Sequence, residues 1–323
     1  MVDSLSRRQV TRKPAIASEG GIVVSQSRLA AQAGAAVLAA GGNAVDAAVV
    51  TSLAVGVVEP WMSGLGGGGL LLHREAASGR VRAWDFGMRS PAALDPTDYP
   101  VEEGAADKDL FGWSAVKEGR NLRGGSAIAV PGQVAGLAAI LEELGTLGWE
   151  DAVAPAILLA ERGVPLDWFS LLQITQHAKE LAGFPASAAI YLEEGLPPGG
   201  LQPPRYLPNR KLRETLIHLA KAGARDFYEG ALAESIAADV QAAGGCLSLQ
   251  DLRSYQAREV TPAIVRHGDA KLHVLPELNG GPTLARAVEQ LRETWSGGPP
   301  DGAFYLAVAQ ALRDAFAHRL EHL

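Results

Sequence analysis

A run of glycines is the stretch of the sequence whose residue types most plainly suggest a site. Four consecutive glycines, residues 66–69, closely follow a fifth at Gly64. Glycine costs backbone entropy, so such a cluster usually marks positive φ angles or the close approach of another backbone or a ligand. The run satisfies G-x-G-x-x-G, but a dinucleotide site needs a strand before the glycines and a helix after them. Here residues 44–58 predict a helix first, and residues 70–74 predict a strand second.

Two interpretations of the glycine run remain. A phosphate-binding loop is disfavoured because the glycines are not followed by Lys and Ser or Thr. The run is therefore either a tight helix-to-strand crossing inside a packed core, or a crossing that lines a buried acyl-transfer site. We prefer the second interpretation.

Two histidines near the end of the sequence match the zinc-protease signature H-x-x-E-H. His318 and His322 are four residues apart, so a helix would place both rings on one face, as two metal ligands require. The sequence ends at Leu323, which leaves no following segment for a third ligand. Cationic side chains in a last helical turn also suit the helix dipole. We therefore expect no metal site.

The remaining polar residues form no complete catalytic set. There is no G-x-S-x-G motif, and none of the seven histidines is an evident triad base. The single cysteine, Cys246, has no neighbouring histidine and is expected to be an inert buried thiol. We expect no catalytic residue in this chain and no cofactor.

Composition narrows the class of protein. The 323 residues are 47% hydrophobic and can bury a sizeable core, and the net charge of −7 argues against nucleic-acid binding. Residues 1–14 are polar, with no apolar segment of a secretory signal, and are expected to be a flexible terminus. The longest apolar run, residues 44–58, is too short to span a bilayer. We expect a cytoplasmic protein with no membrane or nucleic-acid partner.

Hydrophobic periodicity and capping residues predict many helices and a few strands. Helices are expected at residues 28–40, 44–58, 133–144, 151–162, 168–181, 210–222, 231–243, 283–294 and 303–320, with a short helical turn at 249–252. Strands are expected at residues 21–25, 70–74, 80–86, 126–130, 263–266 and 272–275. Residues 95–125 and 183–208 are expected to be irregular surface segments. Sheet segments among many helices predict an α/β or α+β fold.

Several short motifs occur in order along the chain. They are residues 39–48, 58–60, 66–69, 84–86, Pro91, 130–136, 159–163, 226–230, 252–255 and 280–281. This series resembles the large subunit of the gamma-glutamyltranspeptidases, over roughly residues 15–323.

The resemblance implies a fold and a partner. The family fold is that of the N-terminal-nucleophile hydrolases, an α+β, four-layer αββα sandwich made by autocleavage of one precursor. The nucleophile is a threonine at the start of the small subunit, and its free amino group can act as the base. The sequence stops before any such threonine. Residues 15–323 are therefore expected to be the large-subunit half, completed by a small (beta) subunit from the same precursor.

One departure from the family concerns the substrate. Many members place an arginine directly after the phenylalanine that corresponds to Phe86, where it binds the substrate α-carboxylate. Here that position is Gly87, and Arg89 follows two residues later. Bidentate binding by arginine is sensitive to such a displacement. Either Arg89 reaches the carboxylate from a shifted backbone, or the substrate is not gamma-glutamyl; Arg89 could also be a structural ion-pair residue.

These observations predict the large subunit of a gamma-glutamyltranspeptidase-like enzyme. It would hydrolyse or transfer an acyl group from a small carboxylate-bearing amide, with Arg89 as the substrate-binding residue. An alternative is an acylase for a non-glutamyl short acyl amide, such as a dicarboxylic mono-amide. A catalytically silent binding subunit is the alternative from another class. In each case half of a sandwich should expose an apolar sheet face, which isolated soluble proteins rarely tolerate.

Overall fold

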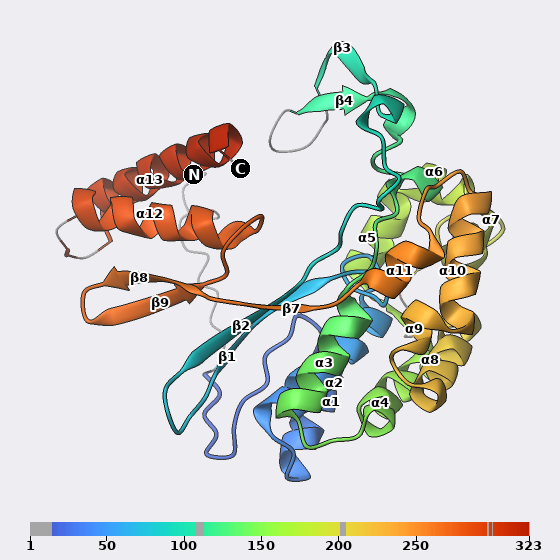
Figure 1. The fold of residues 1–323 in the computed structure, drawn as a ribbon, viewed down its shortest axis with the longest axis horizontal. Coiled ribbons are helices and arrows are strands. Elements are labelled where there is room, and N and C mark those ends of the chain that lie inside the picture. The colour runs from blue at the N-terminus through green and yellow to red at the C-terminus, as the bar shows by residue number, and fades with distance from the viewer. Residues whose placement is uncertain (1–14, 107–112, 201–204, 296, 299, 323) are drawn as a thin grey trace, which may run out of the picture.

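The computed structural model describes residues 15–106, 113–200, 205–295, 297–298 and 300–322. The predicted flexible segment, residues 1–14, lies outside this part of the chain. The described residues combine many helices with short antiparallel strands, so the α+β class predicted from the sequence is observed (Figure 1).

A small antiparallel sheet lies at the centre of the molecule. Its strands are β1 (Gly69–Arg74), β2 (Val81–Phe86) and β7 (Arg258–Val260), in the order β1-β2-β7. The predicted hairpin of β1 and β2 is confirmed, and Gly79 in its turn has a positive φ of 72°. Asp85 of β2 lies opposite Leu70 on one side and opposite Arg258 on the other.

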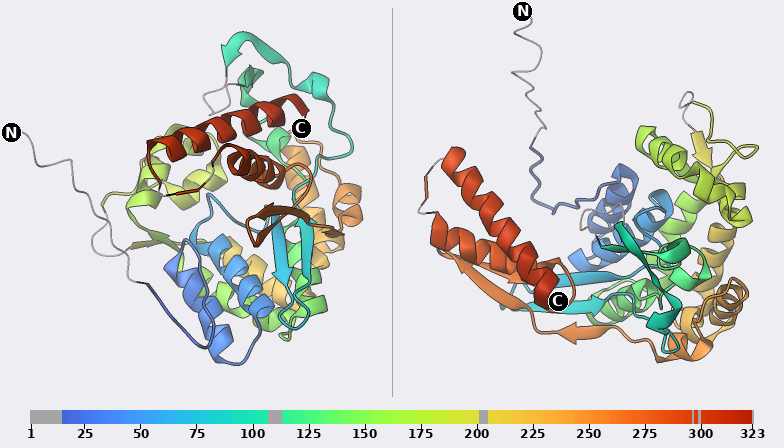
Figure 2. Two further views of the ribbon diagram at one scale, coloured as in Figure 1. Left: turned by 90° about the vertical axis from the view of Figure 1, so that its left-hand side faces the viewer. Right: turned by 90° about the horizontal axis from the view of Figure 1, so that it is seen from above.

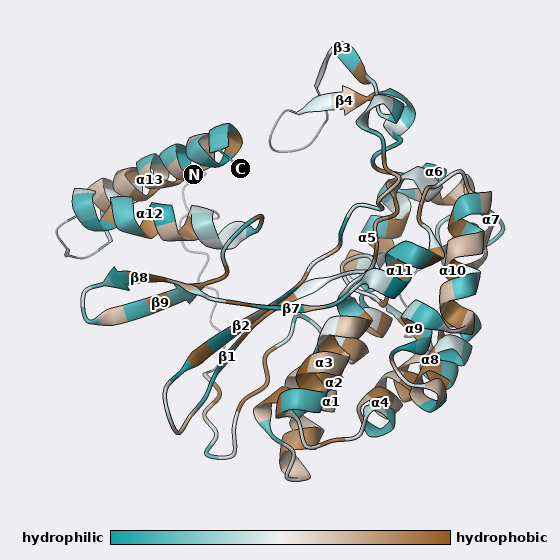
Figure 3. Ribbon diagram, in the orientation of Figure 1, coloured by the Kyte–Doolittle hydropathy of each residue, from teal (hydrophilic) through white to brown (hydrophobic). Residues whose placement is uncertain are grey.

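Helices cover one face of this sheet. The helices of this layer and those packed behind it are α1 (Arg28–Ala39), α2 (Ala44–Val58), α3 (Gln133–Leu144), α4 (Trp149–Arg162) and α8 (Arg210–Ala222). Trp84 and Phe86 point from β2 into the core, where they are only 3% and 4% exposed. Hydrophobic residues of α2 and α3 gather on the same side (Figure 3). The alanine and glycine content of these helices allows their close packing.

A buried carboxylate fixes the start of α2, the helix that leads to the glycine run. Asn43 caps the helix, and its backbone N–H donates to Asp46 Oδ2 at 2.8 Å. The loop between α3 and α4 supplies three further donors to Asp46: the Thr146 N–H, the Thr146 hydroxyl and the Leu147 N–H, at 2.7, 2.7 and 3.1 Å. Burial would raise the pKa of Asp46, but these hydrogen bonds outweigh it and hold the pKa below its usual value.

A second group of helices extends one end of the molecule. They are α5 (Trp168–Gln176), α6 (Ala178–Ala182), α7 (Pro185–Tyr191), α9 (Asp226–Glu229), α10 (Ala231–Ala242) and α11 (Leu249–Ser254). Strands β5 (Val164–Leu166) and β6 (Arg205–Leu207) pair beside them. The prediction of an irregular segment at residues 183–208 was therefore wrong at α7 and β6, because β6 is specified by its pairing with a distant strand.

The C-terminal elements form a unit that stands apart from the helical body (Figures 1 and 2). It consists of the hairpin β8 (Ala263–His267) and β9 (Ala270–Val274), followed by α12 (Gly280–Thr294) and α13 (Gly302–His322). A separate arm, β3 (Val101–Ala106) with β4 (Ser114–Val116), projects at the top of Figure 1, above α6. This arm lies inside the segment 95–125 that was predicted to be irregular.

Two predicted strands are not observed. Residues 21–25 form no ladder with any described strand, and Ile22 and Val24 are 54% and 86% exposed. β-Branched residues alone do not make a strand, because a strand needs a neighbour for its hydrogen bonds. Residues 126–130 instead leave a 3-10 turn at Gly125–Ala127 and meet Arg89 through a single bridge to Val130. None of the described helices is both long enough and apolar enough to cross a bilayer.

Candidate active site

The glycine run crosses from α2 to β1, in the helix-then-strand order predicted from the sequence. The carbonyl oxygen of Gly67 accepts from the N–H groups of Gly132 and Gln133 at 2.8 and 3.0 Å, which attaches the loop to the start of α3. A β-carbon on Gly68 would lie 2.7 to 2.9 Å from backbone atoms of Phe86, Gly87 and Met88. Gly68 therefore lets the loop pack directly against the chain that leaves β2.

The side chain of Phe86 occupies space that other glycines leave free. A β-carbon on Gly69 would lie 2.4 Å from the Phe86 ring, and one on Gly136 would lie 2.1 Å from it. The ring is thus held between the start of β1 and the helix α3. The tight helix-to-strand crossing is therefore confirmed, and the glycines also border an open space. The acyl-transfer site stays a prediction.

That space is a cavity of about 390 Å³ beside the loop. It is lined by Pro60, Met62, Ser63, Gly64, residues 66–68, Met88 and Gln133. The lining is backbone, two thioethers, one hydroxyl and one amide, with no ionisable side chain. The cavity can therefore hold and orient a polar ligand, but its walls supply no pair of groups for general acid–base chemistry.

The face of the sheet opposite the helices is open. Leu70 and Leu72 of β1 point to it and are 44% and 41% exposed, whereas Trp84 and Phe86 on the covered face are almost fully buried. Asp85 lies opposite Leu70 of β1 and opposite Arg258 of β7, so the side chains of all three residues lie on the open face.

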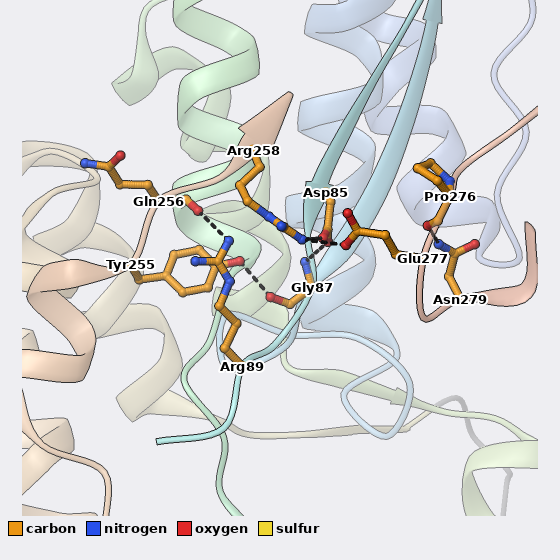
Figure 4. A network of polar contacts seen from close by, with 9 residues as sticks. All are labelled: Asp85, Gly87, Arg89, Tyr255, Gln256, Arg258, Pro276, Glu277 and Asn279. Atoms are coloured by element: carbon orange, nitrogen blue, oxygen red, sulfur yellow. Dashed lines mark hydrogen bonds and ion pairs between the residues drawn. The ribbon is translucent and has the colours of Figure 1, made fainter. Parts of the chain in front are cut away.

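Arg89 lies just beyond the end of β2, where the chain bends away (Figure 4). Its backbone bonds reciprocally with Val130, at 3.2 and 2.8 Å. Its guanidinium lies over the Tyr255 ring, 4.8 Å from the ring centroid, and donates from Nη2 to the Gln256 carbonyl oxygen at 3.1 Å. Arg89 makes no ion pair within the described part of the chain, so the structural ion pair considered for it is not observed there.

Tyr255 contacts both Arg89 and Gly87. Its hydroxyl donates to the Gly87 carbonyl oxygen at 2.7 Å, and its ring stacks on Tyr228 with centroids 5.7 Å apart. Burial raises the pKa of Tyr255 to about 12, so the hydroxyl stays protonated and remains a donor. The position of Gly87 is thus fixed by a residue 168 positions later in the sequence. Sequence reasoning placed Tyr255 in a motif but assigned it no role.

Asp85 holds the other side of Gly87. Its Oδ1 accepts from the Gly87 N–H at 2.8 Å, and its Oδ2 accepts from Arg258 at 2.6 Å. Arg258 also contacts Glu277 at 2.9 Å, which ties the sheet to the C-terminal unit (Figure 4). Partial burial would raise the pKa of Asp85, but the Gly87 N–H and Arg258 outweigh it and lower the pKa. The carboxylate is therefore ionised and engaged rather than free to act as a base.

Other candidates from the sequence lie elsewhere. His318 and His322 stack on each other near the end of α13, with ring centroids 4.2 Å apart. Among the described residues, no group of three His, Cys, Asp or Glu side chains is placed to hold a metal ion. Cys246 is half buried at the turn after α10.

Comparison with known proteins identifies the relatives of this fold. The family model described as Gamma-glutamyltranspeptidase matches residues 30–323. A solved structure of Helicobacter pylori gamma-glutamyltranspeptidase superposes with a TM-score of 0.83 and 28% identity, over 95% of this chain and 85% of that chain.

Two curated relatives show the range of names in the family. A glutathione hydrolase proenzyme of Pseudomonas sp. (strain A14) is 33% identical over 76% of this chain and 41% of its own length. The acylase ACY 1 proenzyme of Pseudomonas sp. (strain V22) is 36% identical over 76% of this chain and 42% of its own length. The chain spans about two fifths of the length of these relatives.

These likenesses confirm the resemblance drawn from the ordered motifs and the N-terminal-nucleophile hydrolase fold that it implied. The chain belongs to the gamma-glutamyltranspeptidase family.

Proposed function

We propose that this chain is the large subunit of a two-chain amidase or acyltransferase whose nucleophile is the N-terminal threonine of a small subunit. The observation that carries the proposal is the open face of the β1-β2-β7 sheet, where Leu70 and Leu72 are exposed on the strand that follows the glycine run. Family relatives are named as proenzymes, and the part of each that matches this chain is about two fifths of its length, which is consistent with a second chain from the same precursor.

The proposed reaction divides the work between the two chains. The threonine hydroxyl attacks the amide carbon, the amide C–N bond breaks, and the threonine amino group passes the hydroxyl proton to the leaving amine. Water or an acceptor amine then releases the acyl group from the threonine oxygen. This chain would bind and orient the amide at the glycine run, since the lining of the cavity there is backbone and uncharged side chains.

Arg89 is the residue that we propose binds a substrate carboxylate. Its stacking on Tyr255 and its bond to the Gln256 carbonyl hold the guanidinium in one orientation. A guanidinium carries five N–H donors, so this single bond leaves donors for a carboxylate. A charge-assisted hydrogen bond of this kind is worth about 1.5–3 kcal/mol.

Substituting Arg89 tests this proposal. Arg89→Ala should lower kcat/KM by roughly ten- to a hundredfold for an amide that bears a carboxylate. Arg89→Lys should recover little of the loss, because an ammonium cannot reproduce the planar fork. The matched control is a second amide that lacks only the carboxylate, and it should be unaffected. An equal loss on both amides with a lower melting temperature would show that Arg89 is structural.

The acylase alternative rests on Gly87 and on the relative named acylase ACY 1. A β-carbon built on Gly87 would meet only the Asp85 Oδ1 atom, at 3.1 Å, so a larger residue could be placed there with a small shift of Asp85. Gly87→Arg restores the family residue and should increase activity on gamma-glutamyl amides if the wild type acts on another acyl group. Unchanged activity on gamma-glutamyl amides would speak against that alternative.

A further inference from the structure

A second cavity, larger than the one at the glycine run, is also lined by Pro60. Its volume is about 710 Å³, within the range of about 300–1,000 Å³ that is usual for small-molecule sites. Its walls come from the α2–β1 loop, the segment before α3, the helices α5, α6 and α7, and the end of α10. It therefore lies where several separate elements converge.

The walls of this cavity are mainly apolar. Leu122, Ile128 and Phe184 line it and are 41% to 56% exposed, while Ile174 closes its inner side and is buried. Large apolar side chains that remain exposed around a hollow mark a binding surface more often than isolated exposed ones do. An aromatic or branched aliphatic group of a ligand would cover these exposed side chains.

The charged side chains that line this cavity are paired with side chains of opposite charge. Glu180 contacts Arg123 at 3.3 Å and His177 Nδ1 at 3.0 Å, so the nearby cation and carboxylate largely cancel. Gln173 adds an amide and Ser187 adds a hydroxyl to the walls. The cavity therefore suits an uncharged apolar group with a polar atom, rather than a free amino acid with its full charges.

The location connects this cavity to the site already described. Pro60 lines both cavities, so the two lie next to each other at this residue. We propose that the larger cavity binds an apolar amine-side group of the amide substrate, aryl or branched alkyl, while the carboxylate-bearing acyl group lies toward Arg89. This inference rests on the proposed function and specifies the substrate class of the same site.

Two matched substrates test it on the two-chain protein. Glutaryl benzylamide and glutaryl methylamide share the acyl group and have alkylamine leaving groups, but only benzylamide carries an apolar body. Ile128→Trp, at an exposed wall position, should fill the cavity and raise KM for the benzylamide about tenfold without changing KM for the methylamide. Leu122→Trp should act in the same direction.

The control is Leu172→Trp, at a 41% exposed position on α5 that does not line the cavity; it should change neither KM. Binding of N-benzylacetamide, followed by saturation-transfer NMR, should weaken in the Ile128 and Leu122 variants only.

Two results would overturn the inference, and they can be told apart. If all variants bind N-benzylacetamide equally well, and the KM values of the two amides change equally or not at all, the amine-side group of the substrate does not use this cavity. If the wild-type two-chain protein turned over neither amide nor any other, the proposed function would fail, and the assignment of a substrate group to this cavity would fail with it.

Discussion

The two faces of the β1-β2-β7 sheet have different surroundings in this chain. On one face Trp84 and Phe86 are 3% and 4% exposed beneath the helices, and on the other Leu70 and Leu72 are 44% and 41% exposed. The same strands supply both sets of side chains, so the difference comes from what packs on each face. The covered face packs against helices of the same chain, and we propose that the small subunit covers the open face, where the two leucines are exposed. Stability should therefore depend on the first face and assembly on the second.

The largest effect is expected at Phe86. Phe86→Ala would empty the space between Gly69 and Gly136, where the ring now lies within van der Waals reach of both. Truncating a buried phenylalanine costs about 3–5 kcal/mol. Leu70→Ala, on the open face of the same sheet, should cost far less. Urea midpoints of the two variants measure the contrast, and equal losses would contradict the distinction between the faces.

The next effect is expected at Asp46, which is fully buried. Asp46→Asn removes a charge that accepts four hydrogen bonds, at a cost of about 2–3 kcal/mol. The folded-state pKa of Asp46 is lowered, so its contribution is present above the unfolded-state pKa of about 3.9 and is lost as the pH falls through and below that value. The wild type should lose more stability than Asp46→Asn between about pH 6 and pH 3.

The measurement is the free energy of unfolding of both proteins at each pH. Asp239→Asn, at an exposed position on α10, is the matched control and should follow the wild type. Parallel pH profiles for the wild type and the Asp46 variant would remove the assigned role of the Asp46 hydrogen bonds.

Two neighbouring glycines separate packing from function at the site. Gly68→Ala would place a β-carbon against the backbone after β2, at an overpacking cost of about 1–3 kcal/mol. Gly66→Ala meets no atom within 4 Å and should be within about 0.5 kcal/mol of the wild type. Gly66 lines the cavity, so a loss of turnover without a loss of stability would assign the loop to substrate binding. Full activity in Gly66→Ala would leave the run with a packing role alone.

The smallest effect on the chain itself is expected at Leu72. Leu72→Ser replaces an exposed leucine and should change the stability of the isolated chain by less than about 0.5 kcal/mol. It should nevertheless weaken association with the small subunit, measured as a higher Kd or as loss of the partner on size-exclusion chromatography. The isolated wild-type chain should bind a hydrophobic dye more strongly than the two-chain protein does. Undiminished association of the variant would mean that the partner does not cover this face.

Local sequence patterns predicted the elements whose determining residues lie within the element itself. The helix-glycine-strand order around residues 58–74 and the hairpin of β1 and β2 could be read from the sequence because capping residues, periodicity and turn residues lie within each element. The strand predicted at residues 21–25 is not observed because β-branched residues need a neighbouring strand, and none of the strands that the structure describes pairs with them. α7 and β6 were missed because proline and glycine dominate their segment.

The site was less predictable than the fold. Composition located the glycine run, and the family resemblance singled out Gly87 and Arg89. However, Gly87 is held by Tyr255, which lies 168 residues later in the sequence. Asp85, which also bonds to Gly87, is paired with Arg258, 173 residues after Asp85. No local pattern encodes such contacts. The orientation of Arg89, over Tyr255 and against the Gln256 carbonyl, likewise follows from chain folding rather than from the residues beside it.

The most direct test of the two-chain mechanism is the intact mass of both polypeptides after acid quenching during turnover of a carboxylate-bearing amide. The acyl group should be found on a second chain that begins with threonine, while the mass of the 323-residue chain should stay unchanged. An acyl adduct on the 323-residue chain, or turnover by that chain with no second chain bound, would contradict the two-chain mechanism.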